Sequence, residues 1–261
     1  MPHLKPILLL LLLTLTLNAN IPKNILNHNT THTLPITKIQ HKDSSDSILQ
    51  SFEYTVDSVG NRTQIIENTG RVTSYEYNSV NQLTKEIVTN DPNNQNTITT
   101  YSYDLVGNLK TKTVDNTTTT YSYNANDQLI TQDAITFTYD SNGNMLSKSD
   151  SDTTTSYSYD DKNRLIKTIT ATDTIEYIYD ANNNRVAKTT NSGTTTYLID
   201  TNTAYAQLIT ESKDDGTTIE YTYGNDLINQ SNSNQTLYYH TDALGSTRGL
   251  TDSNATLTDS L

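Results

Sequence analysis

A short phrase returns along most of this chain: an aromatic residue, a small polar residue, a second aromatic residue, an acid or amide, and then a turn sequence. Its clearest copies begin at Tyr101, Tyr121, Phe137, Tyr157 and Tyr177, and looser copies begin at Tyr54, Tyr75, Tyr197 and Tyr221. A return roughly every twenty residues indicates an array of repeated units rather than one globular core.

One copy of the phrase predicts a β-hairpin. Tyr101 and Tyr103 are two residues apart, so on an extended chain their rings point to the same face. Asp104 can bond its own backbone two residues on, and Gly107 can supply the positive φ that a tight turn requires. The segment that follows, 109–114, contains β-branched residues and neither Gly nor Pro, which is typical of a returning strand.

A lone hairpin is marginally stable in water, so the hairpins must pair edge to edge. The sequence therefore predicts an all-β chain made of an array of antiparallel β-hairpins, with turns at 105–108, 125–128, 141–144, 161–164 and 181–184. Equivalent positions of successive hairpins should share a face. We expect the second aromatics of the repeats to be substantially buried in one ladder: Tyr103, Tyr123, Tyr159 and Tyr179.

The phrase resembles the YD repeat of the Rhs and teneurin families, and the resemblance covers Phe52 to Asp252. The stretch from Tyr238 to Asp252 resembles the start of the Rhs repeat-associated core region. This resemblance implies a curved, spiralling sheet of the YD-shell type, of which this chain would form part. The motif residues that carry it are Tyr101, Tyr103, Asp104, Gly107, Tyr121, Tyr123, Tyr139, Asp140, Gly143, Tyr159, Asp160, Tyr179, Asp180, Tyr239, Asp242, Gly245 and Arg248.

The N-terminus predicts export. Residues 1–19 hold Lys5, a short apolar run and a small residue at Ala19, which suits a signal peptide better than a membrane span. We expect a secreted or cell-surface protein with no membrane span in the mature chain. Residues 20–50 are expected to form a poorly ordered linker, 51–236 the repeat array, and 237–261 the truncated start of the core region.

Composition limits the other classes of function. Disorder is a common outcome for a polar chain of net charge −12, but a disordered segment has no reason to keep aromatic pairs and turns in period. Acidic residues outnumber basic ones by 29 to 17, which argues against a nucleic-acid partner.

Residues for catalysis, cofactors or metals are scarce in the sequence. The chain has no Cys, and His240 has no spaced second ligand, so a structural role is expected for it. The segment from Asp140 resembles a calcium loop, but an EF-hand would require Gly at Met145 and Glu at Ser151. We expect no enzyme activity, no cofactor and no metal. Asp242 and Arg248 have two alternative roles, an ion pair across the bend at Gly245 or a structural part in the bend, and the structural role is favoured.

The resemblance to the Rhs and teneurin families therefore implies a structural protein, part of a shell that encapsulates a toxin or contacts another cell. Its expected partners are a toxin cargo or a second shell chain, because the last segment would leave an unpaired strand edge. The alternative is a carbohydrate-binding or adhesive module that uses exposed Tyr rows, and a straight fibrous adhesin stays open as well. Exposed rings would favour sugar binding, and buried rings would favour the shell.

Overall fold

The computed structural model describes residues 36–43 and 45–260. Over these residues the chain forms 22 strands and no helix. The strands are β1 (Lys38–Lys42), β2 (Ile48–Val56), β3 (Arg62–Glu67), β4 (Val72–Tyr77), β5 (Leu83–Thr89), β6 (Thr97–Tyr103), β7 (Leu109–Val114), β8 (Thr117–Tyr123), β9 (Leu129–Gln132), β10 (Ile135–Tyr139), β11 (Met145–Ser149), β12 (Thr154–Tyr159), β13 (Leu165–Ile169), β14 (Thr174–Tyr179), β15 (Arg185–Thr190), β16 (Gly193–Asp200), β17 (Gln207–Lys213), β18 (Thr218–Tyr223), β19 (Leu227–Ser231), β20 (Thr236–Thr241), β21 (Thr247–Thr251) and β22 (Leu257–Ser260).

The chain divides into two compact units. Unit 1 holds the residues up to Thr100 together with those from Tyr239 onward, and unit 2 holds Tyr101–Tyr238. A helix long and apolar enough to cross a membrane does not occur in the described part of the chain.

In unit 2, each strand from β7 to β19 pairs antiparallel with the next strand along the chain. The predicted turns are confirmed: the N–H of Asp104 donates to the carbonyl of Asn108 at 2.9 Å, and the same bond closes the turns that begin at Asn124, Asp140, Asp160 and Asp180. The expected all-β array of antiparallel hairpins is therefore confirmed.

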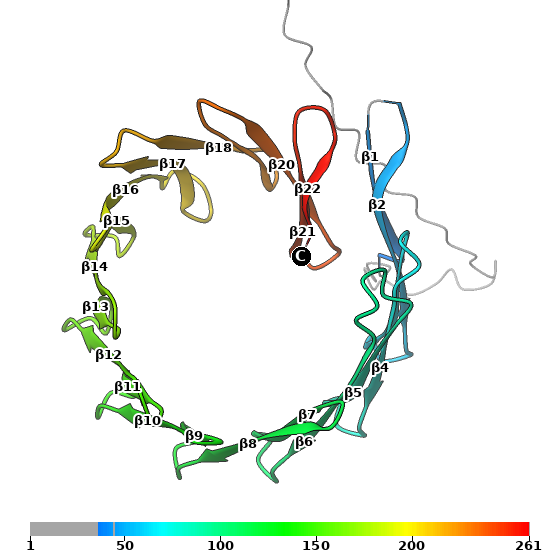
Figure 1. Cartoon of the computed structure of the whole chain (residues 1–261), viewed down its shortest axis with the longest axis horizontal. Coiled ribbons are helices and arrows are strands. Elements are labelled where there is room, and N and C mark those ends of the chain that lie inside the picture. Colours follow the sequence, from blue (N-terminus) through cyan, green and yellow to red (C-terminus); the bar gives the residue numbers. More distant parts are fainter. Residues whose placement is uncertain (1–35, 44, 261) are drawn as a thin grey trace, which may run out of the picture. The chain divides into compact units, whose positions relative to one another are not determined.

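A β-bulge recurs where each of these hairpins meets its turn. In the hairpin of β8 and β9, Tyr123 pairs with Leu129 and Ser122 pairs with Thr131, which leaves Ile130 as an extra residue. The same register shift occurs in the hairpins that begin with β10, β12, β14, β16 and β18. A bulge bends its strand and increases the right-handed twist, so the repeated bulge accounts for the curved path of this unit in Figure 1.

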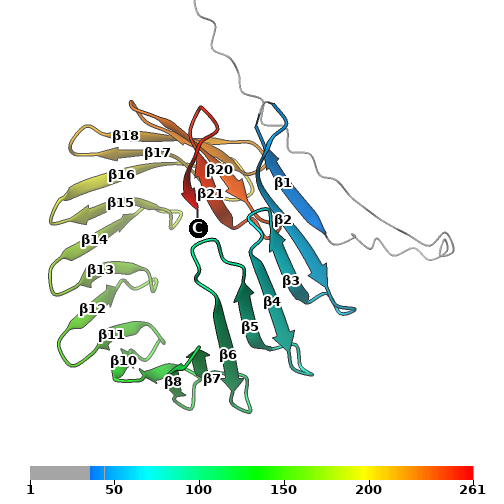
Figure 2. The same cartoon turned by 45° about the vertical axis from the view of Figure 1, so that its right-hand side comes forward.

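Unit 1 contains a meander of β1 to β5, which continues into β6, and the separate hairpin of β21 and β22. Figure 2 shows β2, β3, β4 and β5 side by side. The core of the unit is a cluster of Phe52, Tyr54 and Ile65, against which Ile39 and Ala243 pack. Ala243 belongs to the turn between β20 and β21, so the C-terminal stretch contributes to the core of the N-terminal hairpins.

The expected linker over 20–50 is wrong for 38–42 and 48–50, which lie in β1 and β2. Strand β1 alternates, with Ile39 against the core cluster and His41 only 3% exposed. A buried histidine hides the apolar alternation that marks a strand in the sequence. The expected signal peptide at 1–19 and the rest of the expected linker up to residue 35 lie outside the described residues.

The expected burial of the tyrosine ladder is also wrong in degree. Tyr103, Tyr123, Tyr159 and Tyr179 are half-buried rather than buried. In unit 2 the strands contact chiefly their neighbours in sequence, so a ring is covered by adjacent strands of the same sheet and not by a second layer. A ring in such a sheet keeps part of its surface open.

The residue three positions after the Asp or Asn that opens each of these turns has a positive φ. Examples are Gly143 (88°), after Asp140, and Asn163 (58°), after Asp160. We expect Gly143→Asn to be nearly neutral, because Asn tolerates this region, and Gly143→Val to lower the free energy of unfolding by about 1–2 kcal/mol. Denaturant unfolding of the two variants measures the difference. Equal stability of the Asn and Val variants would show that backbone conformation does not limit this position.

Candidate functional site

Aspartates organise the turns of four repeats and of the C-terminal stretch. In each of these five turns the side-chain oxygen accepts the backbone N–H groups two and four residues further on, at 2.8–3.1 Å. These acceptors are Asp104, Asp140, Asp160, Asp180 and Asp242. The aspartate of the motif is thus a turn-forming residue, because one carboxylate satisfies two backbone donors.

Side-chain hydrogen bonds within the turns also lower the pKa values of the turn carboxylates. The side-chain amide of Asn144 lowers the pKa of Asp140, and the guanidinium of Arg164 lowers that of Asp160. The side-chain amide of Asn184 has the same effect on the pKa of Asp180. A lowered carboxylate pKa gives stability that is present above the unfolded pKa and is lost as pH falls through the folded pKa. The turns are therefore stable to mild acid and weaken only below about pH 4.

Neighbouring repeats are joined by side chains at the turns. The amide of Asn108 donates to Asp127 at 2.9 Å, and the amide of Asn144 donates to Asn163 at 2.8 Å. In the next pair of repeats, the guanidinium of Arg164 donates to Asn183 at 3.1 Å. Each contact runs from the last residue of one turn to the positive-φ residue of the next, so the motif also spaces the hairpins.

The second tyrosine of the repeat makes a further link. The hydroxyl groups of Tyr123, Tyr139 and Tyr179 donate to the carbonyls of Leu109, Leu129 and Leu165, at 2.8–3.0 Å. Each accepting carbonyl lies where the returning strand of the preceding hairpin begins. The rings are therefore held by their hydroxyl groups as well as by packing. Of the other motif tyrosines, Tyr101, Tyr121 and Tyr159 lie half-buried in β6, β8 and β12.

The C-terminal stretch closes unit 1 through three polar contacts. The N–H of Ala243 donates to the Tyr54 hydroxyl at 3.1 Å, and the side chain of Gln50 donates to the carbonyl of Arg248 at 3.3 Å. The third contact joins the Nε2 atom of His41 to the carbonyl of Thr241 at 2.8 Å. Each contact spans about 190 to 200 residues of sequence. The stretch therefore ties the end of the chain to its first described strands.

Two histidines lie at the centre of this closure. His240 is fully buried, and the ring of His41 approaches it edge to face, with ring centroids 4.7 Å apart and an interplanar angle of 72°. The Nε2 atom of His240 lies 2.8 Å from the hydroxyl of Thr251. The sequence singled out His240 but assigned His41 to a linker, so it missed the pair.

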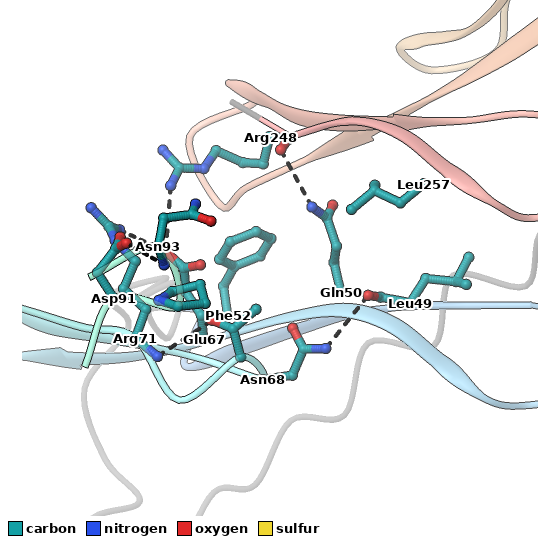
Figure 3. Close-up of a pocket in the computed structure, with 12 residues that line it drawn as sticks. Leu49, Gln50, Phe52, Glu67, Asn68, Arg71, Asp91, Asn93, Arg248 and Leu257 are labelled. Carbon is teal, nitrogen blue, oxygen red and sulfur yellow. Dashed lines mark hydrogen bonds and ion pairs between the residues drawn. The ribbon is translucent and has the colours of Figure 1, made fainter. Parts of the chain in front are cut away.

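A cavity of about 410 Å³ lies beside the closure (Figure 3). Arg71 pairs with Glu67 at 2.8 Å and with Asp91 at 3.0 Å, and Arg248 lies 3.6 Å from Glu67. The guanidinium of Arg248 also lies over the Phe52 ring, 5.6 Å from its centroid. Two cations and two anions cancel, so the lining offers no net charge that would select an ionic ligand.

The alternative of an ion pair between Asp242 and Arg248 is wrong. Asp242 accepts the N–H groups of Leu244 and Ser246, and Arg248 pairs with Glu67 instead. Gly245 has the positive φ of a turn, 77°, and Tyr239 lies half-buried in β20. Among the described residues, no group of three or more His, Cys, Asp or Glu side chains is placed to hold a metal ion.

A family model described as the teneurin YD-shell matches residues 29–260. Among solved structures, that of TcdB2-TccC3-TEV is similar at 13% identity with a TM-score of 0.42, over 85% of this chain and 16% of that one. The structure of TcdB2-TccC3-Cdc42 is similar at 13% identity with a TM-score of 0.41, over 84% of this chain and 16% of that one. The structure of TcdB2-TccC3 without its hypervariable C-terminal region is similar at 14% identity with a TM-score of 0.40, over 85% of this chain and 16% of that one. This chain thus spans a small part of those chains. No curated protein is significantly similar to it.

Proposed function

This chain belongs to the teneurin YD-shell family, and on that premise we propose that it is an exported, non-enzymatic wall segment of a shell that holds a polypeptide cargo. The observation that carries the proposal is the tyrosine-bearing sheet of unit 2. Its rings are half-buried although their hydroxyl groups are bonded within the sheet, so apolar ring surface stays available to another polypeptide.

The carbohydrate alternative has less support. A sugar-binding row needs, besides open ring surface, polar groups that are free to bind hydroxyls. The hydroxyl groups of Tyr123, Tyr139 and Tyr179 instead donate to backbone carbonyls. We therefore propose a protein partner, either a toxin-like cargo or a second shell chain.

The test compares tyrosine reactivity toward hydroxyl radicals in the full chain alone and in the chain mixed with an unfolded model polypeptide such as casein. We expect Tyr139, Tyr159 and Tyr179 to become several-fold less reactive in the presence of the polypeptide. Tyr205 is 87% exposed in the same unit and serves as the internal control. Unchanged reactivity of the three rings, or protection by oligosaccharides and not by the polypeptide, would contradict the proposed cargo role.

Export is tested separately. We expect the protein recovered from the culture medium or cell surface to begin near residue 20 when its N-terminus is sequenced. A protein that retains Met1 and stays within the cell would contradict export while leaving the wall role intact.

A further inference from the structure

The two histidines of the closure are unusual because both are buried and both lack a partner on one nitrogen. His41 is 3% exposed and His240 is fully buried. In each ring the Nδ1 atom is buried without a hydrogen-bond partner among the described residues. Buried polar atoms are normally satisfied, so two orphaned nitrogens in one ring pair call for an explanation.

The hydrogen bonds determine what a proton would do at this site. The carbonyl of Thr241 can only accept, so Nε2 of His41 carries the hydrogen and Nδ1 is the basic nitrogen. The hydroxyl of Thr251 can donate to Nε2 of His240 or accept from it. In either case an imidazolium would need an acceptor at Nδ1, and neither ring has one. Protonation therefore places an unpaired donor and a charge in a buried site.

The charged groups of the surrounding elements do not compensate this charge. In the adjacent turn, Asp242 uses its carboxylate on two backbone N–H groups. From β3 and β21, Glu67 is shared between Arg71 and Arg248. On β1, Lys42 pairs with Asp46 at 2.9 Å.

The neighbours from β2 are uncharged at neutral pH. The register places Gln50 opposite His41, and the Tyr54 hydroxyl accepts the N–H of Ala243. Burial raises the pKa of Tyr54, so this group also stays neutral. A protonated ring of the histidine pair would therefore lie beside a second imidazole and not beside a free carboxylate.

We propose that the His41–His240 pair is an acid-sensitive clasp, which holds the C-terminal stretch against β1 at neutral pH and releases it when either ring takes up a proton. The neutral pair packs edge to face and bridges two distant segments. Separation of the segments gives both rings access to water, so the open form accepts the proton that the closed form resists.

The pKa values give the direction and the pH window. Burial, together with the nearby His41, lowers the pKa of His240 to about 4. Burial also lowers the pKa of His41, against the Thr241 carbonyl, which raises it. The stabilisation by the neutral histidines is therefore fully present above about pH 6.5 and is lost as pH falls toward 4. Over this range the ratio of closed to open molecules falls by about two to three powers of ten.

The test is hydrogen exchange of the full chain at pH 7.5 and pH 5.0, corrected for the intrinsic rate. We expect protection of 38–42 and 239–251 to fall by about ten-fold or more at pH 5.0, and protection of 145–149 in unit 2 to change by less than about two-fold. The turn carboxylates do not titrate in this window because their pKa values lie lower still.

The matched variant combines His41→Gln with His240→Gln, which keeps a neutral polar side chain at both positions and removes both titrations. We expect its protection of 38–42 to be the same at both pH values. If this variant is unprotected at both, NMR titration of the imidazole resonances in the unmodified chain decides, with at least one ring expected to titrate well below pH 6.5. Constant protection of the unmodified chain, or titration of both rings near 6.5, would overturn the clasp.

Discussion

Replacing Phe52 with Ala should lower the free energy of unfolding of unit 1 by about 3–5 kcal/mol, the largest effect expected of a single side chain. Phe52 is 3% exposed and forms the core cluster with Tyr54 and Ile65. Its ring also lies beneath the guanidinium of Arg248. The substitution removes contacts to both the N-terminal hairpins and the C-terminal stretch. Denaturant unfolding, resolved by hydrogen exchange into the two units, measures the loss.

The matched control is Val59→Ala, in the turn that follows the same strand. Val59 is 69% exposed, so the change should stay within about 0.5 kcal/mol. Because contacts in unit 2 run chiefly between neighbouring strands, protection of Tyr101–Tyr238 should survive the Phe52 substitution. A loss below about 1 kcal/mol in unit 1 would show that the cluster is not the core of that unit.

The hairpins were predictable because their causes are local. Two aromatics at a spacing of two, an Asx residue and a residue able to adopt positive φ occur within eight positions of sequence. The bonds from Asp104 to the N–H groups of Val106 and Asn108 are made within the same eight positions. The chain therefore reverses its direction at the positions that these local residues predict.

The bulge and the degree of ring burial were not predictable in the same way. A bulge leaves the apolar or β-branched character of the returning strand unchanged, so Ile130 looks like any other strand residue. Burial depends on whether a second layer covers the sheet, and the spacing of tyrosines is the same with or without one. Half-burial of Tyr123 and Tyr179 follows from the single layer.

The closure of unit 1 depends on residues far apart in the chain. His41 and His240 belong to segments that sequence order separates, and neither shows in its own neighbourhood that it meets the other. The same holds for Arg248, whose partner Glu67 lies in β3 and not across its own bend. The resemblance to the core region distinguished the stretch from Tyr238 to Asp252 from the repeats, but it did not indicate which strands this stretch contacts.

The second large effect is expected at Gly249, where β21 pairs with β22 and is approached by the side chain of Gln50 from β2. A Cβ atom at this position would lie 2.7 Å from Nε2 of Gln50 and 3.0 Å from the backbone oxygen of Asp259. The Gln50 side chain can move, whereas the carbonyl of Asp259 belongs to the paired hairpin. We expect Gly249→Val to lower the free energy of unfolding of unit 1 by about 1–3 kcal/mol, with loss of protection in 239–251.

Two further variants identify the clash. Leu244→Ala is the control on the same stretch, because Leu244 is 75% exposed and its truncation should change stability by less than about 0.5 kcal/mol. Gly249→Ala is also measured in a Gln50→Ala background, which removes the Gln50 side chain and its hydrogen bond to the Arg248 carbonyl but keeps the Asp259 carbonyl in place. We expect Gly249→Ala to cost less in this background than in the unmodified chain but still to lower stability, because the backbone contact persists. If Gly249→Ala had no cost in this background, the whole effect would belong to Gln50, and an unchanged stability of Gly249→Val would show that the C-terminal hairpin does not pack against β2 as closely as the contacts indicate.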